Sequence, residues 1–185
     1  MGVYIGVGIG VVLLLILIWA IASYNNFIKM RNDYEEAFST MDVFLKKRYD
    51  LIPNIVETVK GYAKHESQTL DNVIKARNSA MQATTAEDKI NTDNALSGAL
   101  KSIFALSEAY PDLKANTNFI NLQNQLQKIE DEIAGSRRYY NAVVKNYNTK
   151  TEVFPSSIIA SMFNFTQKPL FIINEEQREN VKVEF

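Results

Sequence analysis

The sequence predicts an all-α membrane protein in which an N-terminal transmembrane helix continues into an antiparallel, up-down bundle of about four helices. Three observations predict this fold. The N-terminus is an uncharged apolar run, apolar residues recur at steps of three and four along most of the remaining chain, and prolines or polar caps separate these periodic segments. The expected division is an anchor over residues 1–23, a helical bundle over 24–154 and a C-terminal tail over 155–185.

The apolar run over residues 3–22 contains no charged side chain. About 20 apolar residues in a helix cover the hydrocarbon core of a bilayer. Trp19 and Tyr24 lie near one end of the run, which is typical of aromatic residues at a membrane interface. The run therefore predicts a membrane-spanning helix.

A cleavable signal peptide is the alternative interpretation, with Ala20 and Ala22 as the small residues of a cleavage site. No Lys or Arg precedes the run, and the run is longer than a typical signal-peptide core, so an uncleaved single-pass anchor is favoured. Lys29 and Arg31 follow the run, and the positive-inside rule therefore predicts a cytoplasmic C-terminal domain.

Helices are expected near residues 3–50, 53–83, 86–109 and 117–152. Proline suits the first turn of a helix, so Pro53 is expected to begin the second helix. Thr85 and Asp88 resemble a capping box that opens the third helix, and Pro111 ends it. The connections are short, which makes neighbouring helices antiparallel.

This topology places two turns at the far tip of the bundle. Arg48, Glu57 and Glu108 would lie at one level along the axis, which predicts an ion-pair network joining Arg48 to Glu108 or Glu57. Such a network would shape a partner-binding surface, although these residues could merely form turns. The candidate interaction tip comprises Arg48, Asp50, Pro53, Asn54, Glu57, Glu108, Tyr110, Pro111, Asp112 and Lys114.

Several polar residues fall on or beside the apolar stripes of the helices. Burying a lone charge is costly, so these charges are expected to be paired or to lie at the ends of the bundle. The favoured interpretation is a set of ion pairs that fixes helix register, and the alternative is a polar ligand or proton site. The candidate structural polar core comprises Glu66, Arg77, Glu130, Arg137, Tyr140 and Asn141.

Catalytic groups are scarce in the sequence. There is no cysteine, and the one histidine, His65, is followed four residues later by Thr69, where a zinc protease motif needs a second histidine. The glycines form no phosphate-binding loop, so no catalytic residue, cofactor site or metal site is predicted. The net charge of −1 gives no reason to expect nucleic-acid binding.

Several motifs resemble those of the LemA family of bacterial membrane proteins. They are RYDLIPNIVETVKGYAKHE from Arg48, EAYPDLKAN from Glu108, RRYYNAVVKNYN from Arg137 with Glu130 before it, and the ending VFPSSIIASMFNF with VKVEF. The resemblance implies a short N-terminal span, a bundle-like helical domain and a place in the bacterial inner membrane. It implies no particular reaction, because fold and family alone do not give a function.

The expected function is that of a membrane-anchored, non-enzymatic interaction or scaffold protein. Its expected partners are the lipid bilayer and an unidentified, membrane-associated protein, and a homo-oligomer is a further option. A sensor or regulator whose bundle responds to a ligand or a stress signal is the alternative. An enzyme of unrecognised type is the third hypothesis, which the scarcity of catalytic groups disfavours.

The tail contains a short apolar segment over residues 156–165. It could bury one face in the headgroup boundary of the bilayer, or it could fold back and cap the open end of the bundle. Val181, Val183 and Phe185 alternate with charged residues, which predicts a short strand at the C-terminus.

Overall fold

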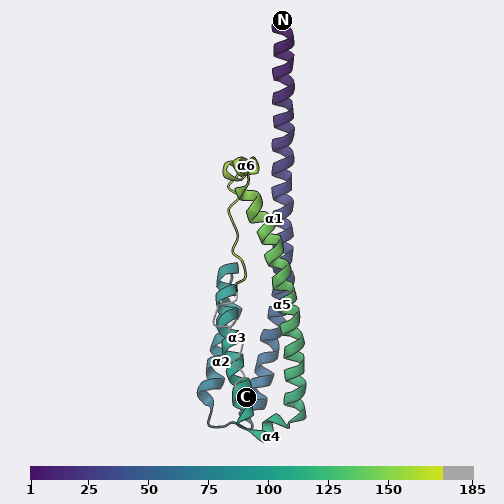
Figure 1. Ribbon diagram of the computed structural model, residues 1–185. Helices are drawn as coiled ribbons and strands as arrows, with labels where there is room; N and C mark the ends of the chain where they lie inside the picture. The colour runs from purple at the N-terminus through teal and green to yellow at the C-terminus, as the bar shows by residue number, and fades with distance from the viewer. Residues whose placement is uncertain (173–185) are drawn as a thin grey trace, which may run out of the picture. The chain divides into compact units, whose positions relative to one another are not determined.

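The computed structural model describes residues 1–172, and all regular elements in that range are helices (Figure 1). They are α1 (Gly2–Lys60), α2 (Ser67–Gln82), α3 (Ala86–Glu108), α4 (Pro111–Lys114), α5 (Thr117–Glu152) and α6 (Ser156–Met162). This order confirms the all-α fold, with a long apolar helix at the N-terminus followed by a helical bundle. The strand expected near residues 181–185 lies outside the described range.

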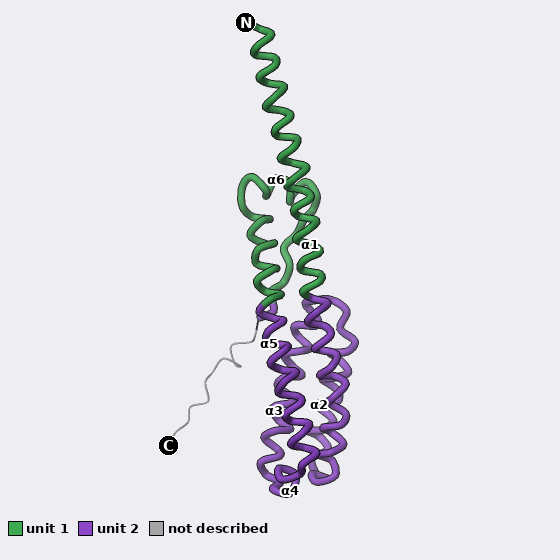
Figure 2. Tube along the Cα trace, turned by 90° about the vertical axis from the view of Figure 1, so that its right-hand side faces the viewer, with its two compact units in different colours: residues 1–37, 139–170 green, residues 38–138, 171–185 purple. Residues whose placement is uncertain are grey.

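The chain forms two compact units, coloured separately in Figure 2. Unit 1 contains residues 1–37 and 139–170, and unit 2 contains residues 38–138 with the described tail residues from 171 onward. Both α1 and α5 contribute residues to each unit.

Unit 2 is the antiparallel bundle. Figure 2 shows segments of α1, α2, α3 and α5 running along one another, with the short α4 at one end. Residues at steps of three and four fill the interior, as expected for helices that bury one face. The buried apolar side chains include Leu45, Ile52, Val73, Leu96, Ile103, Leu113, Phe119, Leu126 and Ile133.

The first turn of the bundle lies elsewhere than expected. α1 continues through Pro53 to Lys60, and α2 begins only at Ser67, so the predicted helix start at Pro53 is wrong. A proline inside a helix removes the N–H that would bond the carbonyl four residues earlier, here that of Tyr49. The Nε of Arg77 in α2 donates a hydrogen bond to this carbonyl at 2.7 Å. A side chain from the next helix therefore supplies the donor that Pro53 lacks.

The start of α3 agrees with the capping-box prediction. The backbone N–H of Asp88 donates to the Thr85 hydroxyl at 3.1 Å, and the same hydroxyl donates to the Asp88 carboxylate at 2.7 Å. This reciprocal pair satisfies one of the free N–H groups of the first turn and orders the cap.

Unit 1 contains the apolar N-terminal part of α1. Every large apolar side chain from Val3 to Ile18 is more than half exposed, and the most apolar 18-residue window has a mean hydropathy of 2.9. This segment is long and apolar enough to be a candidate membrane span. Below it, Phe27 and Tyr147 form a buried core together with Ile159 and Ala160 of α6.

Candidate functional site

Four charged side chains meet inside unit 2, and we call them the charge cluster: Arg48 of α1, Asp93 of α3, and Glu130 and Arg137 of α5. One oxygen of the Asp93 carboxylate pairs with Arg48 and the other with Arg137. Arg48 Nη1 also lies 3.0 Å from Glu130 Oε1 and donates to the Ser97 hydroxyl at 3.2 Å. The cluster thus joins three helices of the bundle.

Because these charged side chains are buried, the fold is stable only if they are paired. The side chains of Arg48 and Asp93 are fully buried, that of Arg137 is 14% exposed and that of Glu130 is 34% exposed. An unpaired charge at such a position would cost several kcal/mol, which pairing with the opposite charge offsets. Two cations and two anions leave the cluster with no formal net charge, so its charges are matched within the bundle.

The described end of the tail lies against the same region of unit 2. The Arg137 guanidinium is 4.7 Å from the centroid of the buried Phe171 ring, which is cation–π geometry. The Asn94 side-chain amide donates to the Ile172 carbonyl at 3.3 Å. These contacts cover Arg137 with an aromatic face and reduce its access to water.

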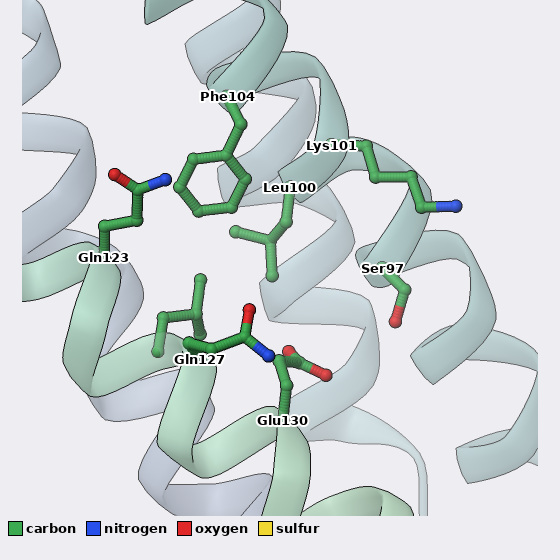
Figure 3. Close-up of a pocket in the computed structure, with 8 residues that line it drawn as sticks. Ser97, Leu100, Lys101, Phe104, Gln123, Gln127 and Glu130 are labelled. Atoms are coloured by element: carbon green, nitrogen blue, oxygen red, sulfur yellow. The ribbon is translucent and has the colours of Figure 1, made fainter. Parts of the chain in front are cut away.

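A pocket of about 290 Å³ opens beside the charge cluster, between α3 and α5 (Figure 3). Glu130 and Ser97 belong to its lining and also contact Arg48, so pocket and cluster share two residues. The rest of the lining consists of apolar side chains, two amides and one lysine, and Figure 3 labels Phe104, Gln123, Gln127 and Lys101 among them. The chemistry of this lining suits a small molecule with both polar and apolar parts.

The structure does not form the predicted tip network. Arg48 pairs with Asp93 and Glu130, whereas Glu108 pairs with Lys114 and Glu57 lies 3.8 Å from Lys60. The reason is the continuation of α1 past Pro53. Because α1 ends at Lys60, Arg48 lies about 18 Å below its end, at a rise of about 1.5 Å per residue.

Because α1 continues to Lys60, two candidate tip residues lie away from the tip. Asp50 and Asn54 lie within α1 and do not form a turn. The Asp50 carboxylate pairs with Lys46 at 2.8 Å, and the Asn54 carbonyl accepts a bond from the Thr58 hydroxyl at 2.8 Å.

The observed tip consists of residues 61–66 and 109–116. Asn116 donates to the Tyr62 hydroxyl at 2.8 Å, and the Tyr110 hydroxyl is 3.4 Å from a Glu66 carboxylate oxygen. Glu66 therefore contacts the tip. The candidates Tyr110, Pro111, Asp112 and Lys114 also lie in this region, the last three of them in α4.

A second pocket of about 250 Å³ lies between α1 and α2 near this tip, and we call it the tip groove. Val56, Ala63 and Leu70 are buried apolar residues of its lining. The exposed charged residues of the lining are Glu57, Lys60, Lys64 and Asp71. Of the candidate tip residues, Pro53 and Glu57 line this groove.

The model of the LemA family matches residues 37–185. The chain belongs to the LemA family. It is 25% identical over 161 residues to protein LemA of Metamycoplasma hominis, a match that covers 85% of this chain and 72% of the relative. It is 22% identical over 174 residues to magnetosome protein MamQ 2 of Paramagnetospirillum magneticum, and 21% identical to magnetosome protein MamQ of Magnetospirillum gryphiswaldense. Each of these two matches covers 80% of this chain but only 64% of the relative.

In this LemA-family chain, the matched residues 37–185 include the charge cluster and both pockets. Most of the apolar N-terminal helix precedes the match. The family relationship therefore concerns the bundle and the tail, whereas the span is inferred from the apolar run itself.

Asp93, the central member of the charge cluster, was not among the residues that the sequence analysis singled out. It lies three residues before Leu96 and seven before Leu100, both of which are buried on the same stripe. Extending that stripe toward the N-terminus of α3 would have placed Asp93 at a core position.

The other members of the candidate polar core lie in different surroundings. Arg77 supplies the donor for the Tyr49 carbonyl, as described above. Tyr140 and the partly buried Asn141 belong to unit 1. The Tyr140 hydroxyl donates to the Pro169 carbonyl at 3.0 Å, and burial raises the pKa of Tyr140 to about 12, with a smaller contribution from Tyr34.

His65 is exposed at the turn before α2. Within residues 1–172, no group of three or more His, Cys, Asp or Glu side chains is placed to hold a metal ion.

Proposed function

We propose that this protein is a membrane-anchored, non-enzymatic scaffold that presents its helical bundle to a membrane-associated partner. The observation that carries the proposal is the charge cluster. Its acids and bases are matched to one another across α1, α3 and α5, which suits a rigid module of fixed register. Membership of the LemA family supports the same coarse assignment.

The proposed anchor is the apolar segment of α1, as a single span of the bacterial inner membrane. Lys29 and Arg31 are exposed just beyond the segment, so the positive-inside rule puts the bundle in the cytoplasm. The chain has no cysteine, so one introduced cysteine is a unique label. In intact spheroplasts, Lys128→Cys should resist a membrane-impermeant maleimide and react only after the membrane is permeabilised.

The tip groove is the proposed docking site for the partner. Its buried apolar residues would accept apolar side chains of the partner, and its charges of both signs would select the partner's register. The anchor tethers the chain to the bilayer, which favours a partner that is itself membrane-associated. A second copy of this chain is an alternative occupant that the following test identifies.

Photocrosslinking in cells tests this docking site. A benzophenone amino acid at Lys64, on the groove, is compared with the same group at Lys128, an exposed lysine of α5. A crosslinked product is expected at Lys64 and not at Lys128, and Asp71→Lys should weaken it by reversing a charge of the groove. Equal products at both positions, or a product indifferent to Asp71→Lys, would contradict docking there. A product of twice the chain mass would identify a homo-oligomer.

The pocket beside the charge cluster supports a second candidate function, that of a sensor. A ligand that bound Glu130 from the pocket would compete with Arg48 and so act on the pairing that joins three helices. Thermal stabilisation of the purified protein by a small cationic amphiphile, lost in Gln127→Ala but retained in Lys128→Ala, would favour the sensor. A scaffold without this function would show no ligand-dependent shift.

A further inference from the structure

The short helix α6 packs against α1 at the point where the apolar segment ends. Ile159 and Ala160 of α6 are buried in the core of unit 1, and Ala20 and Tyr24 of α1 pack against that core. Figure 2 shows α6 beside α1 within unit 1, with the N-terminal part of α1 extending beyond it. α6 therefore lies at the level of residues 20–27, directly after the candidate span.

The opposite side of this region is apolar and open. We call its three residues the α6 face: Phe154 is 82% exposed, Ile158 49% and Met162 70%. The neighbouring Phe163 is 51% exposed, and its ring centroid lies 4.7 Å from that of Tyr24 on α1. α6 itself, SSIIASM, contains no charged residue. Soluble surfaces rarely gather large apolar side chains in this way, and such patches commonly mark contact with a partner or a membrane.

Specific bonds hold α6 in this orientation at its start. The Ser156 side chain is buried, and its hydroxyl lies 2.8 Å from the Lys150 carbonyl and 3.0 Å from the Val153 carbonyl. The Ser157 N–H bonds the Val153 carbonyl at 2.9 Å. These contacts join the end of α5 firmly to the start of α6.

The end of α6 is fixed as well. Asn164 adopts a left-handed conformation with φ 57°, and the Phe165 N–H bonds the Ala160 carbonyl at 2.9 Å, which is the pattern of a Schellman motif. The reversal brings the Phe165 ring onto Phe27, with centroids 4.8 Å apart and planes at 14°. The α6 face is therefore presented by a helix that is anchored at both ends.

Beyond the reversal, the chain runs back along α5. The Asn148 side-chain amide donates to the Lys168 carbonyl at 2.9 Å and accepts from the Lys168 N–H at 2.8 Å. The next contact along the chain is the bond from the Tyr140 hydroxyl to the Pro169 carbonyl at 3.0 Å. These contacts hold residues 163–170 on unit 1, and the α6 face is exposed with these residues in place.

We propose that the α6 face inserts into the headgroup and acyl boundary of the same bilayer that α1 spans. The inference rests on the proposed span. A helix over residues 3–22 rises about 30 Å, which matches the hydrocarbon core of a bilayer. Residues 20–24 then lie at the membrane surface, and α6, which packs against them, lies at the same depth. Interfacial helices bury their apolar side by about 5–10 Å at this level.

The partner chemistry follows from the composition of the surface. Because α6 carries no basic residue, insertion depends on apolar contact and gains little from anionic lipid. The sequence left two alternatives for the tail, contact with lipid and packing against the helices, and α6 would do both with different sides. Ile159 and Ala160 face the core of unit 1, and the α6 face is left for lipid.

Depth-dependent quenching in the full chain tests the proposal. Three single-cysteine variants, Met162→Cys, Val11→Cys and Glu36→Cys, carry an environment-sensitive fluorophore and are reconstituted into phosphatidylcholine vesicles. Glu36 is an exposed residue of α1 in unit 1, farther along the helix from the span than the α6 contacts. We expect deep spin-labelled lipids to quench position 11 and shallow ones to quench position 162, with little quenching at position 36.

Each outcome has a definite meaning. Quenching at position 11 with no more at 162 than at 36 would overturn the inserted α6 face and leave the span intact. Absence of quenching at position 11 would overturn the span and the insertion together. Quenching at position 162 that appeared only with phosphatidylglycerol would overturn the apolar mode of binding. Circular dichroism of each variant, and a second label at Ile158→Cys, separate these outcomes from local unfolding.

Discussion

Units 1 and 2 fill their interiors with different chemistry. The core of unit 1 is aromatic and aliphatic. The ring centroids of Phe27 and Tyr147 lie 6.2 Å apart in an edge-to-face arrangement, and the Phe27 ring stacks on Phe165. Unit 2 places Arg48 and Asp93, both fully buried, among its apolar residues. Apolar contacts are non-directional, whereas buried charges need partners at fixed positions. The buried ion pairs therefore fix the register of the helices in unit 2, whereas apolar contacts hold α6 against α1 next to the candidate span in unit 1.

The largest expected effect tests the role of charge in unit 2. Asp93→Asn removes the anion that pairs with both Arg48 and Arg137 and leaves two buried cations with Glu130 alone. We expect a loss of about 3–5 kcal/mol in the free energy of unfolding. Urea unfolding of the full chain in detergent micelles, followed by circular dichroism, measures it.

Two matched variants sharpen this first comparison. Glu132→Gln neutralises an exposed acid of α5 and should change the stability by less than about 0.5 kcal/mol. Tyr147→Phe removes a polar atom from the apolar core of unit 1 and should cost less than about 1 kcal/mol. If Asp93→Asn were no more harmful than these two, the charge cluster would not specify the bundle.

Local signals in the sequence were sufficient for much of the fold. The expected helices at 86–109 and 117–152 correspond to α3 (Ala86–Glu108) and α5 (Thr117–Glu152), because caps and periodicity are encoded by adjacent residues. Pro53 was misread for the opposite reason. The donor that lets it lie inside α1 is Arg77, and a local rule for proline does not include a side chain from the next helix.

The sequence could predict which charged residues of the candidate site need partners, but it could not predict which residues pair with one another. The sequence identified Arg48 at the tip, and Glu130 and Arg137 in the polar core, as charges that need partners. Choosing those partners required the true end of α1 and the inclusion of Asp93 on the stripe of α3. The return of residues 163–170 along unit 1 has no periodic signal, since it depends on single contacts such as those of Asn148.

The second prediction uses pH to probe unit 1. Burial raises the pKa of Tyr140 to about 12, so the folded chain keeps this proton at pH values where an unfolded tyrosine, with a pKa of about 10, loses it. Stability is therefore complete below about pH 10 and falls by up to about 3 kcal/mol as the pH rises toward 12. Unfolding measured across this range should show the slope.

Neighbouring tyrosines provide the control for this pH dependence. Tyr140→Phe should flatten the alkaline slope, whereas Tyr139→Phe, which alters a tyrosine that is 57% exposed, should leave it unchanged. Burial also raises the pKa of Tyr147 and of Tyr34, so a smaller slope remains after Tyr140→Phe. An equal slope in both variants would show that Tyr140 is not the group responsible.

The third prediction concerns the proline inside α1. Arg77→Met leaves the Tyr49 carbonyl without its donor, and we expect a loss of about 1–3 kcal/mol. Pro53→Ala in the same chain restores a backbone N–H four residues after Tyr49 and should recover most of that loss. Lys75→Met, an exposed residue of α2, is the control. Additive effects of the Arg77 and Pro53 substitutions in a double-mutant cycle would disprove the replacement of one donor by the other.

The smallest effect concerns the reversal that presents the α6 face in unit 1. Asn164 has φ 57°, a conformation that asparagine tolerates, glycine adopts freely and a β-branched residue resists. Asn164→Gly should be nearly neutral, whereas Asn164→Val should cost about 1–2 kcal/mol. Because this cost falls on the end of α6, amide hydrogen exchange is the suitable measurement. The Phe165 N–H, bonded to the Ala160 carbonyl, should exchange faster in Asn164→Val, while amides of the unit 2 core keep their rates. Equal exchange in the Val and Gly variants would mean that the reversal does not depend on the conformation of residue 164, and that the stacking of Phe165 on Phe27 alone holds the end of α6.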